Sequence, residues 1–291
     1  MSTKHLVTGA TGNISSLVTF RLIERGIRPL IFVRDEARAR AMFGDAVEIR
    51  VGDLGASQRS LAAAFAGMDT LFLLNSGPDL AARDRTVALA AQRAGVSHLV
   101  KLSTLDVLTG VGTGPWHAKG EAAVQESGLD YTFIRSAGFM SNALYWAESI
   151  KTEGVLRSST GEGKIAFIHP ADIADSAVHA LTTRELRRKA VVITGPKALS
   201  YAEMADVIGA AIGKRIRYEP ISDSEARFGR DAYAKAVTDI WRAITEGRVA
   251  TTTDAVQRII GREPRSFDQW VAENLKEFAA PGRSRGRRAQ S

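Results

Sequence analysis

The chain has 291 residues, 45% of them hydrophobic, a formal net charge of +7, no cysteine, and five histidines that are not paired at metal-ligand spacing. This length supports one large core, or a core with a small lobe, and the absence of cysteine excludes disulfides, thiolate catalysis and cysteine-bound metals. No metal site is predicted. No apolar run approaches the roughly 20 residues of a membrane helix and no secretory signal precedes the first strand, so a cytoplasmic protein without membrane contact is expected.

The first half of the chain alternates strands and helices. Apolar runs that end in turns predict strands at residues 4–8, 29–34, 47–51, 70–74, 98–102 and 131–135. Amphipathic segments between them predict helices at residues 13–25, 36–43, 57–66, 79–94 and 116–127. Such repeats form right-handed parallel crossovers with helices on both faces of a sheet. An α/β fold, with a Rossmann-type doubly wound parallel sheet, is therefore expected in residues 1–137.

The pattern is less regular after Gly138. Strands are predicted at residues 164–168, 190–193 and 216–219, and helices at residues 171–182, 201–212, 231–246, 254–260 and 267–278. These elements cannot form a second parallel sheet of similar size. We expect residues 138–280 to form a smaller C-terminal α+β lobe, interleaved with the sheet and covering the substrate.

Residues 281–291 contain Arg283, Arg285, Arg287 and Arg288. We predict a disordered basic tail there. A basic tail can bind nucleic acid, but a solvated chain end is the simpler interpretation, and nucleic acid is not the favoured partner.

A glycine-containing segment, residues 8–15, follows the first strand directly. Gly9 permits a tight turn, and Gly12 lets the backbone approach a pyrophosphate with no Cβ in the way. The helix that follows offers unpaired N–H groups and the positive end of its dipole. Because it lies between an apolar strand and an amphipathic helix, the segment predicts a dinucleotide phosphate site. The residues assigned to it are Gly9, Thr11, Gly12, Asn13 and Ile14.

The second strand ends at Val33, Arg34 and Asp35. NAD-specific sites usually place a carboxylate at this strand end, whereas the guanidinium of Arg34 can bind a 2′-phosphate. Asp35 weakens the argument, because it can pair with Arg34 or repel the phosphate. NADPH is the expected cofactor, with NADH as the alternative.

Polar residues also follow the third and fourth strands. Asp53 is placed to accept a hydrogen bond from the adenine amino group, and Asn75 and Ser76 are placed to lie beside the ribose and pyrophosphate. Ordinary turn chemistry explains the same residue types equally well. Leu54, which follows Asp53, is assigned to the same site.

Taken together, these residues resemble the NmrA-like branch of the atypical short-chain dehydrogenase/reductase superfamily. The other matching segments are residues 52–54, 127–135, 138–142, 167–174, 194–196 and 261–267. The resemblance covers almost the whole chain outside the tail and implies NAD(P)(H) binding, with Gly138 and Phe139 added to the site. Family members include quinone and enone reductases, and also regulators that sense the cofactor without chemistry. Ser15 replaces the third glycine of the loop, and Ser136 stands where relatives often carry proline.

The usual acid of short-chain reductases is missing from this sequence. These enzymes use a Tyr-x-x-x-Lys pair; the candidate lysine is Lys119, but Pro115 stands four residues before it. Lys119 can still hold the nicotinamide ribose, or donate a proton if desolvation lowers its pKa; the alternative is a surface lysine. Other candidate donors, each with a favoured structural role, are Ser103 (also assigned to the cofactor site), Thr104, His117, Tyr145 and His169.

Two segments near the expected cleft bear on the substrate. Residues 105–115 contain three glycines and are predicted to form a mobile lid. Residues 139–146 are rich in aromatic side chains, which give apolar walls to a flat substrate or else join the two lobes.

The leading hypothesis is an NADPH-dependent oxidoreductase that reduces a small quinone, enone or ketone, including aromatic metabolites, by hydride transfer. A quinone needs no strong protein acid, because water can protonate its oxygen. The alternatives are a non-catalytic NAD(P)-sensing regulator and a cofactor-retaining isomerase or dehydratase. The expected partner is a small molecule, and the chain is expected to be a monomer or a homodimer.

Overall fold

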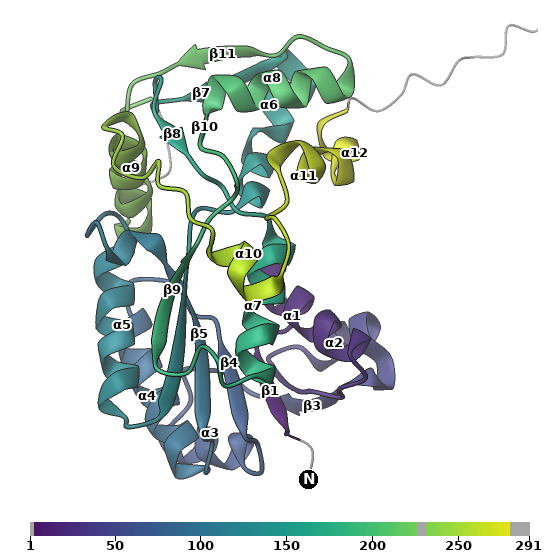
Figure 1. Ribbon diagram of the computed structural model, residues 1–291, viewed down its shortest axis with the longest axis vertical. Helices are drawn as coiled ribbons and strands as arrows, with labels where there is room; N and C mark the ends of the chain where they lie inside the picture. Colours follow the sequence, from purple (N-terminus) through teal and green to yellow (C-terminus); the bar gives the residue numbers. More distant parts are fainter. Residues whose placement is uncertain (1–2, 226–230, 280–291) are drawn as a thin grey trace, which may run out of the picture.

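A seven-stranded parallel sheet forms the centre of the molecule (Figure 1). The structure, a computed structural model, describes residues 3–225 and 231–279, so the predicted tail at residues 281–291 lies outside it. The strands are β1 His5–Thr8, β2 Leu30–Val33, β3 Glu48–Val51, β4 Thr70–Leu73, β5 His98–Thr104, β6 Asp130–Ser136 and β9 Lys189–Ile193. Their order is β3-β2-β1-β4-β5-β6-β9, with every neighbouring pair parallel. The predicted doubly wound sheet is confirmed, and the winding reverses between β1 and β4.

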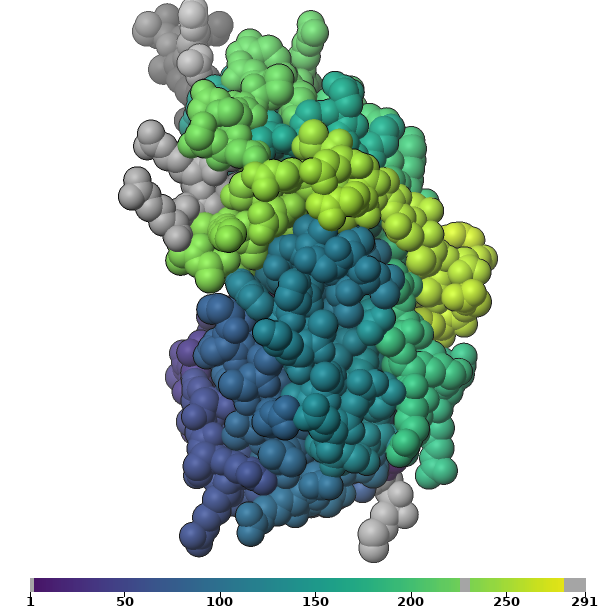
Figure 2. All heavy atoms as spheres, turned by 90° about the vertical axis from the view of Figure 1, so that its left-hand side faces the viewer, coloured from purple at the N-terminus to yellow at the C-terminus, as the bar shows by residue number. Residues whose placement is uncertain are grey.

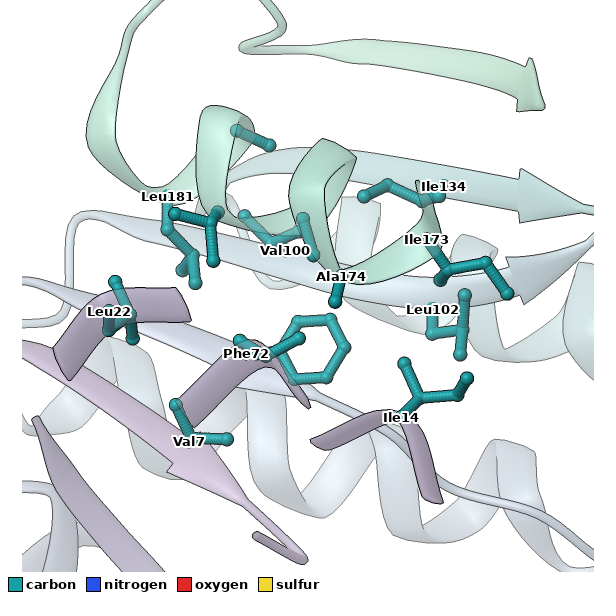
Figure 3. Close-up of a cluster of buried hydrophobic side chains, with 14 of the residues drawn as sticks. Val7, Ile14, Leu22, Phe72, Val100, Leu102, Ile134, Ile173, Ala174 and Leu181 are labelled. Carbon is teal, nitrogen blue, oxygen red and sulfur yellow. The ribbon is translucent and has the colours of Figure 1, made fainter. Parts of the chain in front are cut away.

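Helices cover both faces of this sheet. One face carries α1 Asn13–Glu24, α2 Glu36–Phe43, α7 Pro170–Thr182 and α10 Ala255–Ile260. The other carries α3 Gln58–Phe65, α4 Leu80–Arg93 and α5 Gly114–Glu126. Side chains alternate along each strand, so Val7 packs in the first core and Leu6 in the second. Figure 3 shows the first core, where side chains of the sheet and α1 meet those of α7. Burial on both faces explains the continuous apolar strands of the sequence.

The second half of the chain returns to this sheet. Helix α7 begins at Pro170, and the ring of His169 caps it by accepting a 3.0 Å hydrogen bond from the Ala171 backbone N–H at Nδ1. After α7, strand β9 pairs with β6 as the last strand of the sheet. Residues 170–193 therefore complete the sheet of the Rossmann half. The division into two units at residue 137 stays a prediction.

The remaining elements form a separate layer at the carboxyl edge of the sheet, the lobe at the top of Figure 1. Its own hydrophobic core also takes in Leu105 and Val111, from the segment between β5 and α5. The sequence did not predict α6 or β7, and the strand expected at residues 164–168 is only two residues long. The helix expected at residues 267–278 is divided at Asn274. The elements are η3 Met140–Trp146, α6 Ala147–Glu153, β7 Val155–Ser158, β8 Lys164–Ile165, β10 Leu199–Ser200, α8 Tyr201–Ile212, β11 Arg217–Pro220, α9 Ala232–Thr245, α11 Phe267–Glu273 and α12 Leu275–Phe278.

Two of the matching segments, residues 167–174 and 261–267, meet in a cluster of ion pairs. The carboxylate of Asp172 is fully buried and contacts the guanidinium groups of Arg262 and Arg265. It also accepts a 2.7 Å hydrogen bond from the backbone N–H of Arg265. Asp175 of α7 pairs at 2.9 Å with Arg21 of α1. These two segments therefore fix the C-terminal chain and α1 onto α7, which is a structural role.

Candidate cofactor and active site

The glycine loop after β1 has the geometry of an anion site. Gly9 has a positive φ of +62°, which favours glycine, and its N–H donates to the carbonyl of Phe32. Gly12 then donates to the carbonyl of Gly9 at 2.9 Å and becomes the N-cap of α1. No side chain caps this helix and no acidic residue stands in its first turn. The N–H groups and the positive end of the dipole are therefore open to a phosphate.

The residues after Gly12 hold the helix in place beneath the loop. The side chain of Ile14 is buried and points toward Phe72 and Leu102 in the first core (Figure 3). Ile14 can thus bind a phosphate only through its backbone N–H group. Asn13 is exposed, and its amide donates a 2.9 Å hydrogen bond to Ser141 of the lobe. This contact joins the loop to the lobe across the expected cofactor position.

Arg34 follows β2 at the same edge of the sheet. Its side chain is 83% exposed, and its Nη1 lies 3.8 Å from Oδ2 of Asp53. Asp35 does not compete for it, since its carboxylate caps α2 by accepting from the Arg38 backbone N–H at 2.9 Å. An exposed guanidinium in a long ion pair remains able to bind a 2′-phosphate.

Asp53 and Leu54 lie in the turn after β3. One carboxylate oxygen of Asp53 accepts from the backbone N–H of Gly55 at 2.7 Å, and the other faces Arg34. Leu54 is half-buried against the second core. The hydrogen bond to Gly55 is ordinary turn chemistry, so the adenine contact proposed for Asp53 stays a prediction.

Asn75 connects the end of β4 to a buried ion pair. Its amide nitrogen donates to Asp84 at 3.2 Å, and its amide oxygen accepts from the Arg83 side chain and from the backbone N–H of Ser76. The other oxygen of Asp84 lies 2.7 Å from Nζ of Lys101 on β5, and both side chains are fully buried. Asn75 and Ser76 are thus held in place at the carboxyl edge of the sheet.

Ser103 lies at the end of β5 and faces α5. Its hydroxyl donates a 2.6 Å hydrogen bond to Glu121, which also pairs with Arg135 of β6 at 2.5 Å. The Ser103 side chain is buried. Because its hydroxyl is already committed to Glu121, the structure favours the structural role for this residue.

His117 and Lys119 lie on different faces of α5. Burial, and next the charge of Lys101, lower the pKa of His117 to about 3, so its ring is neutral. Lys119 is exposed. At about 100° per residue, it points away from the face that carries His117 and Glu121. Proton donation by Lys119 was conditional on its desolvation, and its side chain is exposed. A role at the ribose stays a prediction.

Two tyrosine side chains of the lobe are exposed. Tyr145 of η3 is 85% exposed and Tyr233 of α9 is 52% exposed. Burial, and next the electrostatic effect of Tyr145, raise the pKa of Tyr233. Leu144, beside Tyr145, is also exposed. Tyr145 therefore belongs to an apolar surface rather than to a buried acid site.

The segment between β5 and α5 is packed rather than free. Val111 is buried in the core of the lobe. A Cβ on Gly112 would lie only 2.4 Å from Ile240 of α9. Figure 2 shows the segments coloured green to yellow, from α9 onward, lying across this end of the molecule. This packing does not favour the predicted mobile lid.

The sequence interpretation missed Asp106 in this same segment. The residue lies in the short turn η2 Leu105–Val107, directly after β5, and is half-buried. Burial raises its pKa to about 6, although a hydrogen bond from Thr104 opposes the shift. The sequence does contain a signal for this residue, namely a carboxyl group shortly after a central strand. The glycines that follow it instead favoured the interpretation of the segment as a mobile lid.

Gly138 and Phe139 follow β6. A Cβ on Gly138 would lie 2.7 Å from the ring of Phe167, so only glycine fits there without movement. Phe139 is half-buried against the first core, and its backbone bridges to Ile168. Both residues lie at the expected edge of the sheet, and their contact with a cofactor stays a prediction.

Two cavities lie in the lobe and not at the glycine loop. One, of about 340 Å³, is lined by residues of α8 and the turn before β11. The other, of about 180 Å³, lies between α8, α11 and Phe167. In residues 3–225 and 231–279, no group of histidines and carboxylates could hold a metal ion, and no helix is long and apolar enough to cross a membrane.

Known proteins share the whole architecture. The profile of a family described as NAD(P)H-binding matches residues 9–184. The NAD(P)H azoreductase of Xenophilus azovorans is 33% identical over 290 residues, covering 94% of this chain and 99% of the relative. The NADPH-dependent quinone oxidoreductase of Escherichia coli, solved with NADPH, superimposes with a TM-score of 0.83 at 24% identity, covering 93% and 99% of the two chains. The negative transcriptional regulator NmrA superimposes with a TM-score of 0.75 at 15% identity, covering 95% and 96%.

Proposed function

This chain belongs to the NAD(P)H-binding family and is an NAD(P)H-dependent oxidoreductase, and we propose that it reduces a small, planar, conjugated acceptor, namely a quinone, enone or ketone. The observation that carries the proposal is one juxtaposition. The uncapped N-terminus of α1 lies beside η3, because Asn13 hydrogen-bonds to Ser141, and the same η3 exposes Leu144 and Tyr145. A flat apolar acceptor suits such side chains.

The residues of the glycine loop fit a dinucleotide. The backbone N–H groups at Asn13 and Ile14 would bind the pyrophosphate, and the guanidinium of Arg34 the 2′-phosphate. The bound cofactor supplies a hydride, that is, two electrons and one hydrogen. The chain itself positions the acceptor, excludes water beneath the lobe and provides a proton.

The relatives support the choice of a conjugated acceptor. One relative is named an azoreductase and another a quinone oxidoreductase. Both names describe reduction of a flat π system. An azo compound therefore belongs in the test beside the quinone, enone and ketone.

A substitution at Arg34 tests the preference for NADPH. Arg34→Ala is expected to weaken NADPH binding by about tenfold to a hundredfold, because a charge-assisted pair of hydrogen bonds is lost. Binding of NADH, which lacks the 2′-phosphate, is expected to stay unchanged. Fluorescence titration of both cofactors measures this, with Arg38→Ala as the exposed arginine control. Equal losses for both cofactors would show that Arg34 does not read the 2′-phosphate.

The substrate class is tested by cofactor oxidation with a panel of acceptors. Wild-type protein is expected to oxidise NADPH with a quinone or an enone. Tyr145→Ala is expected to raise KM for a two-ring acceptor about fivefold, with kcat little changed, since an aromatic contact of about 1 kcal/mol is lost. Leu275→Ala, which truncates an exposed leucine of α12, is the matched control. A panel that leaves NADPH unoxidised would contradict the proposal.

A cofactor-sensing regulator is the second candidate. Pro115 replaces the usual tyrosine, and Lys119 is exposed, so the usual proton donor of short-chain reductases is missing. This reading predicts tight binding, discrimination between the oxidised and reduced cofactor, and no turnover with any acceptor. Turnover at rates above about 1 s⁻¹ would remove it.

A further inference from the structure

The group that supplies the proton is the open question at this site. Three of the proton donors weighed from the sequence are less suitable in the structure: Ser103 is bonded to Glu121, His117 is neutral and half-buried, and Lys119 is exposed. Asp106 is different, because it lies in the turn that follows β5, two residues after Thr104, and has no ion-pair partner among residues 3–225 and 231–279.

The position of Asp106 places it at the covered edge of the sheet. Strand β5 lies between β4 and β6, and its last residue, Thr104, pairs with Ser136 of β6. The glycine loop after β1, Asn75 after β4 and Gly138 after β6 end at the same edge, because the strands are parallel. Leu105, the neighbour of Asp106, is already part of the lobe core. Asp106 therefore lies where the lobe meets the sheet.

One side chain holds the Asp106 carboxyl in place. The Thr104 hydroxyl donates to Oδ2 of Asp106 at 3.0 Å, and the same Thr104 oxygen accepts from the Asp106 backbone N–H at 3.3 Å. The main-chain carbonyl of Asp106 accepts from Gly110 at 2.8 Å. Gly114 packs so closely that a Cβ there would lie 2.2 Å from that carbonyl. The backbone is thus fixed, and the carboxyl has one neutral donor.

No cation neutralises this carboxyl within the described residues. Burial raises its pKa to about 6, and Thr104 is the one group that lowers it. Glu121 and Arg135 pair with each other, and His117 is neutral. The ionisable groups on the elements packed against the segment that holds the turn are His117, Lys119, Glu121 and Glu126 on α5, Asp130, Tyr131 and Arg135 on β6, and Tyr233, Lys235, Asp239 and Arg242 on α9.

We propose that the carboxyl group of Asp106 is the proton donor of the reduction and that Thr104 positions it. The proposal rests on the proposed function. The acceptor gains two electrons and one hydrogen from the reduced dinucleotide, its carbonyl π bond breaks, and its oxygen takes the proton of Asp106. Water then returns a proton to the carboxylate. Ketones and enones depend on this proton more than quinones do, because a reduced quinone oxygen is protonated readily by water.

The first test needs no substrate. The carboxyl carbons of aspartate are labelled with ¹³C, Asp106 is assigned by its loss in Asp106→Asn, and its titration is followed by NMR. A pKa near 6 is expected, and a higher one in Thr104→Val, which lacks the hydrogen bond that lowers it. An ordinary pKa near 4 would overturn the proposal.

The second test is the pH profile of kcat/KM with an enone. A general acid must be protonated, so the wild-type rate is expected to fall as pH rises above about 6. Thr104→Val is expected to move this fall to higher pH. At pH 5, kcat/KM of Asp106→Asn is expected to be about 100-fold below that of wild type. The variant is expected to show no decrease of kcat/KM as pH rises, so that variant and wild type differ little at pH 9. An equal loss at every pH would mean a purely structural role and would overturn the proposal.

Stability gives a third, independent measurement. Since the folded-state pKa of Asp106 is raised, its ionisation opposes folding; this cost is absent below pH 4 and grows until about pH 6. The melting temperature of Asp106→Asn is expected to be higher than that of wild type at pH 8 and equal to it at pH 4. A variant that melts below wild type at pH 8 would contradict the proposal.

The outcomes for the two proposals can be told apart. If wild type reduces no acceptor, the reductase assignment fails together with the donor role. If wild type is active and Asp106→Asn keeps the pH profile of wild type, only the donor role fails.

Discussion

A Lys101→Met variant is expected to lose about 3–5 kcal/mol of unfolding free energy. Lys101 of β5 and Asp84 of α4 form a 2.7 Å ion pair in which both side chains are fully buried. Removal of the ammonium group leaves the carboxylate with the amide of Asn75 as its donor in the described structure. An uncompensated charge in a low-dielectric core is among the costliest single changes in a protein.

Urea unfolding of wild type and variants measures this loss. Lys119→Met is the matched control, because it removes an exposed lysine from the neighbouring α5, and a change within about 0.5 kcal/mol is expected. The double variant Lys101→Met with Asp84→Asn is expected to regain much of the stability, since no unpaired charge then remains. A single variant within about 1 kcal/mol of wild type would show that the buried pair is not charged.

A Gly12→Asp variant is expected to lose NADPH binding by at least about a hundredfold while it folds normally. Gly12 is the N-cap of α1, with φ −89° and ψ 170°, a conformation open to any residue. An aspartate there would accept hydrogen bonds from the N–H groups that a phosphate needs, and its charge would repel the pyrophosphate. Aspartate is a favourable N-cap, so the free energy of unfolding is expected to be unchanged or slightly higher.

Gly12→Asn is the matched control for this experiment. Asparagine has the same shape and capping ability without the charge, and both variants place a Cβ 3.2 Å from the carbonyl of Gly9. Fluorescence titration is expected to give a smaller loss for Gly12→Asn than for Gly12→Asp. Equal affinity in wild type and Gly12→Asp would mean that the dinucleotide does not bind at this helix.

The Rossmann half could be predicted from sequence because its signals are local. The period of α1, with Ile14, Val18 and Leu22 on the core side, and the apolar strand before it lie within one short segment. The same is true of the turn at Gly9, which needs a positive φ. The resemblance to NmrA-like reductases, carried by these motifs, is confirmed by the family and the similar structures.

The lobe was harder to predict because long-range contacts form it. Helix α6 has seven residues, too few to be stable alone, and it is held by the burial of Ala147 and Ile150 in the lobe core. Strand β7 pairs with β11, about 60 residues later in the chain, which no local pattern indicates.

The catalytic residues stay predictions, for a related reason. Lys119 was the candidate lysine of the Tyr-x-x-x-Lys pair, but the inward face of α5 includes a charged residue, Glu121, whose partners lie on β5 and β6. Asp106 is half-buried in a segment that packs, through Gly112, against Ile240 of α9, more than a hundred residues away. Neither the direction in which a side chain of α5 points nor the burial of Asp106 follows from the composition of these segments.

The most direct test of the central claim is a single turnover. Protein is saturated with NADPH carrying deuterium at C4, mixed with one equivalent of a quinone or enone, and followed by cofactor absorbance and by mass analysis of the product. We predict one cofactor oxidised for each acceptor reduced, with deuterium in the enone product and no reaction in Gly12→Asp. A complex that binds NADPH tightly and leaves every acceptor unreduced would contradict the reductase and indicate a regulator.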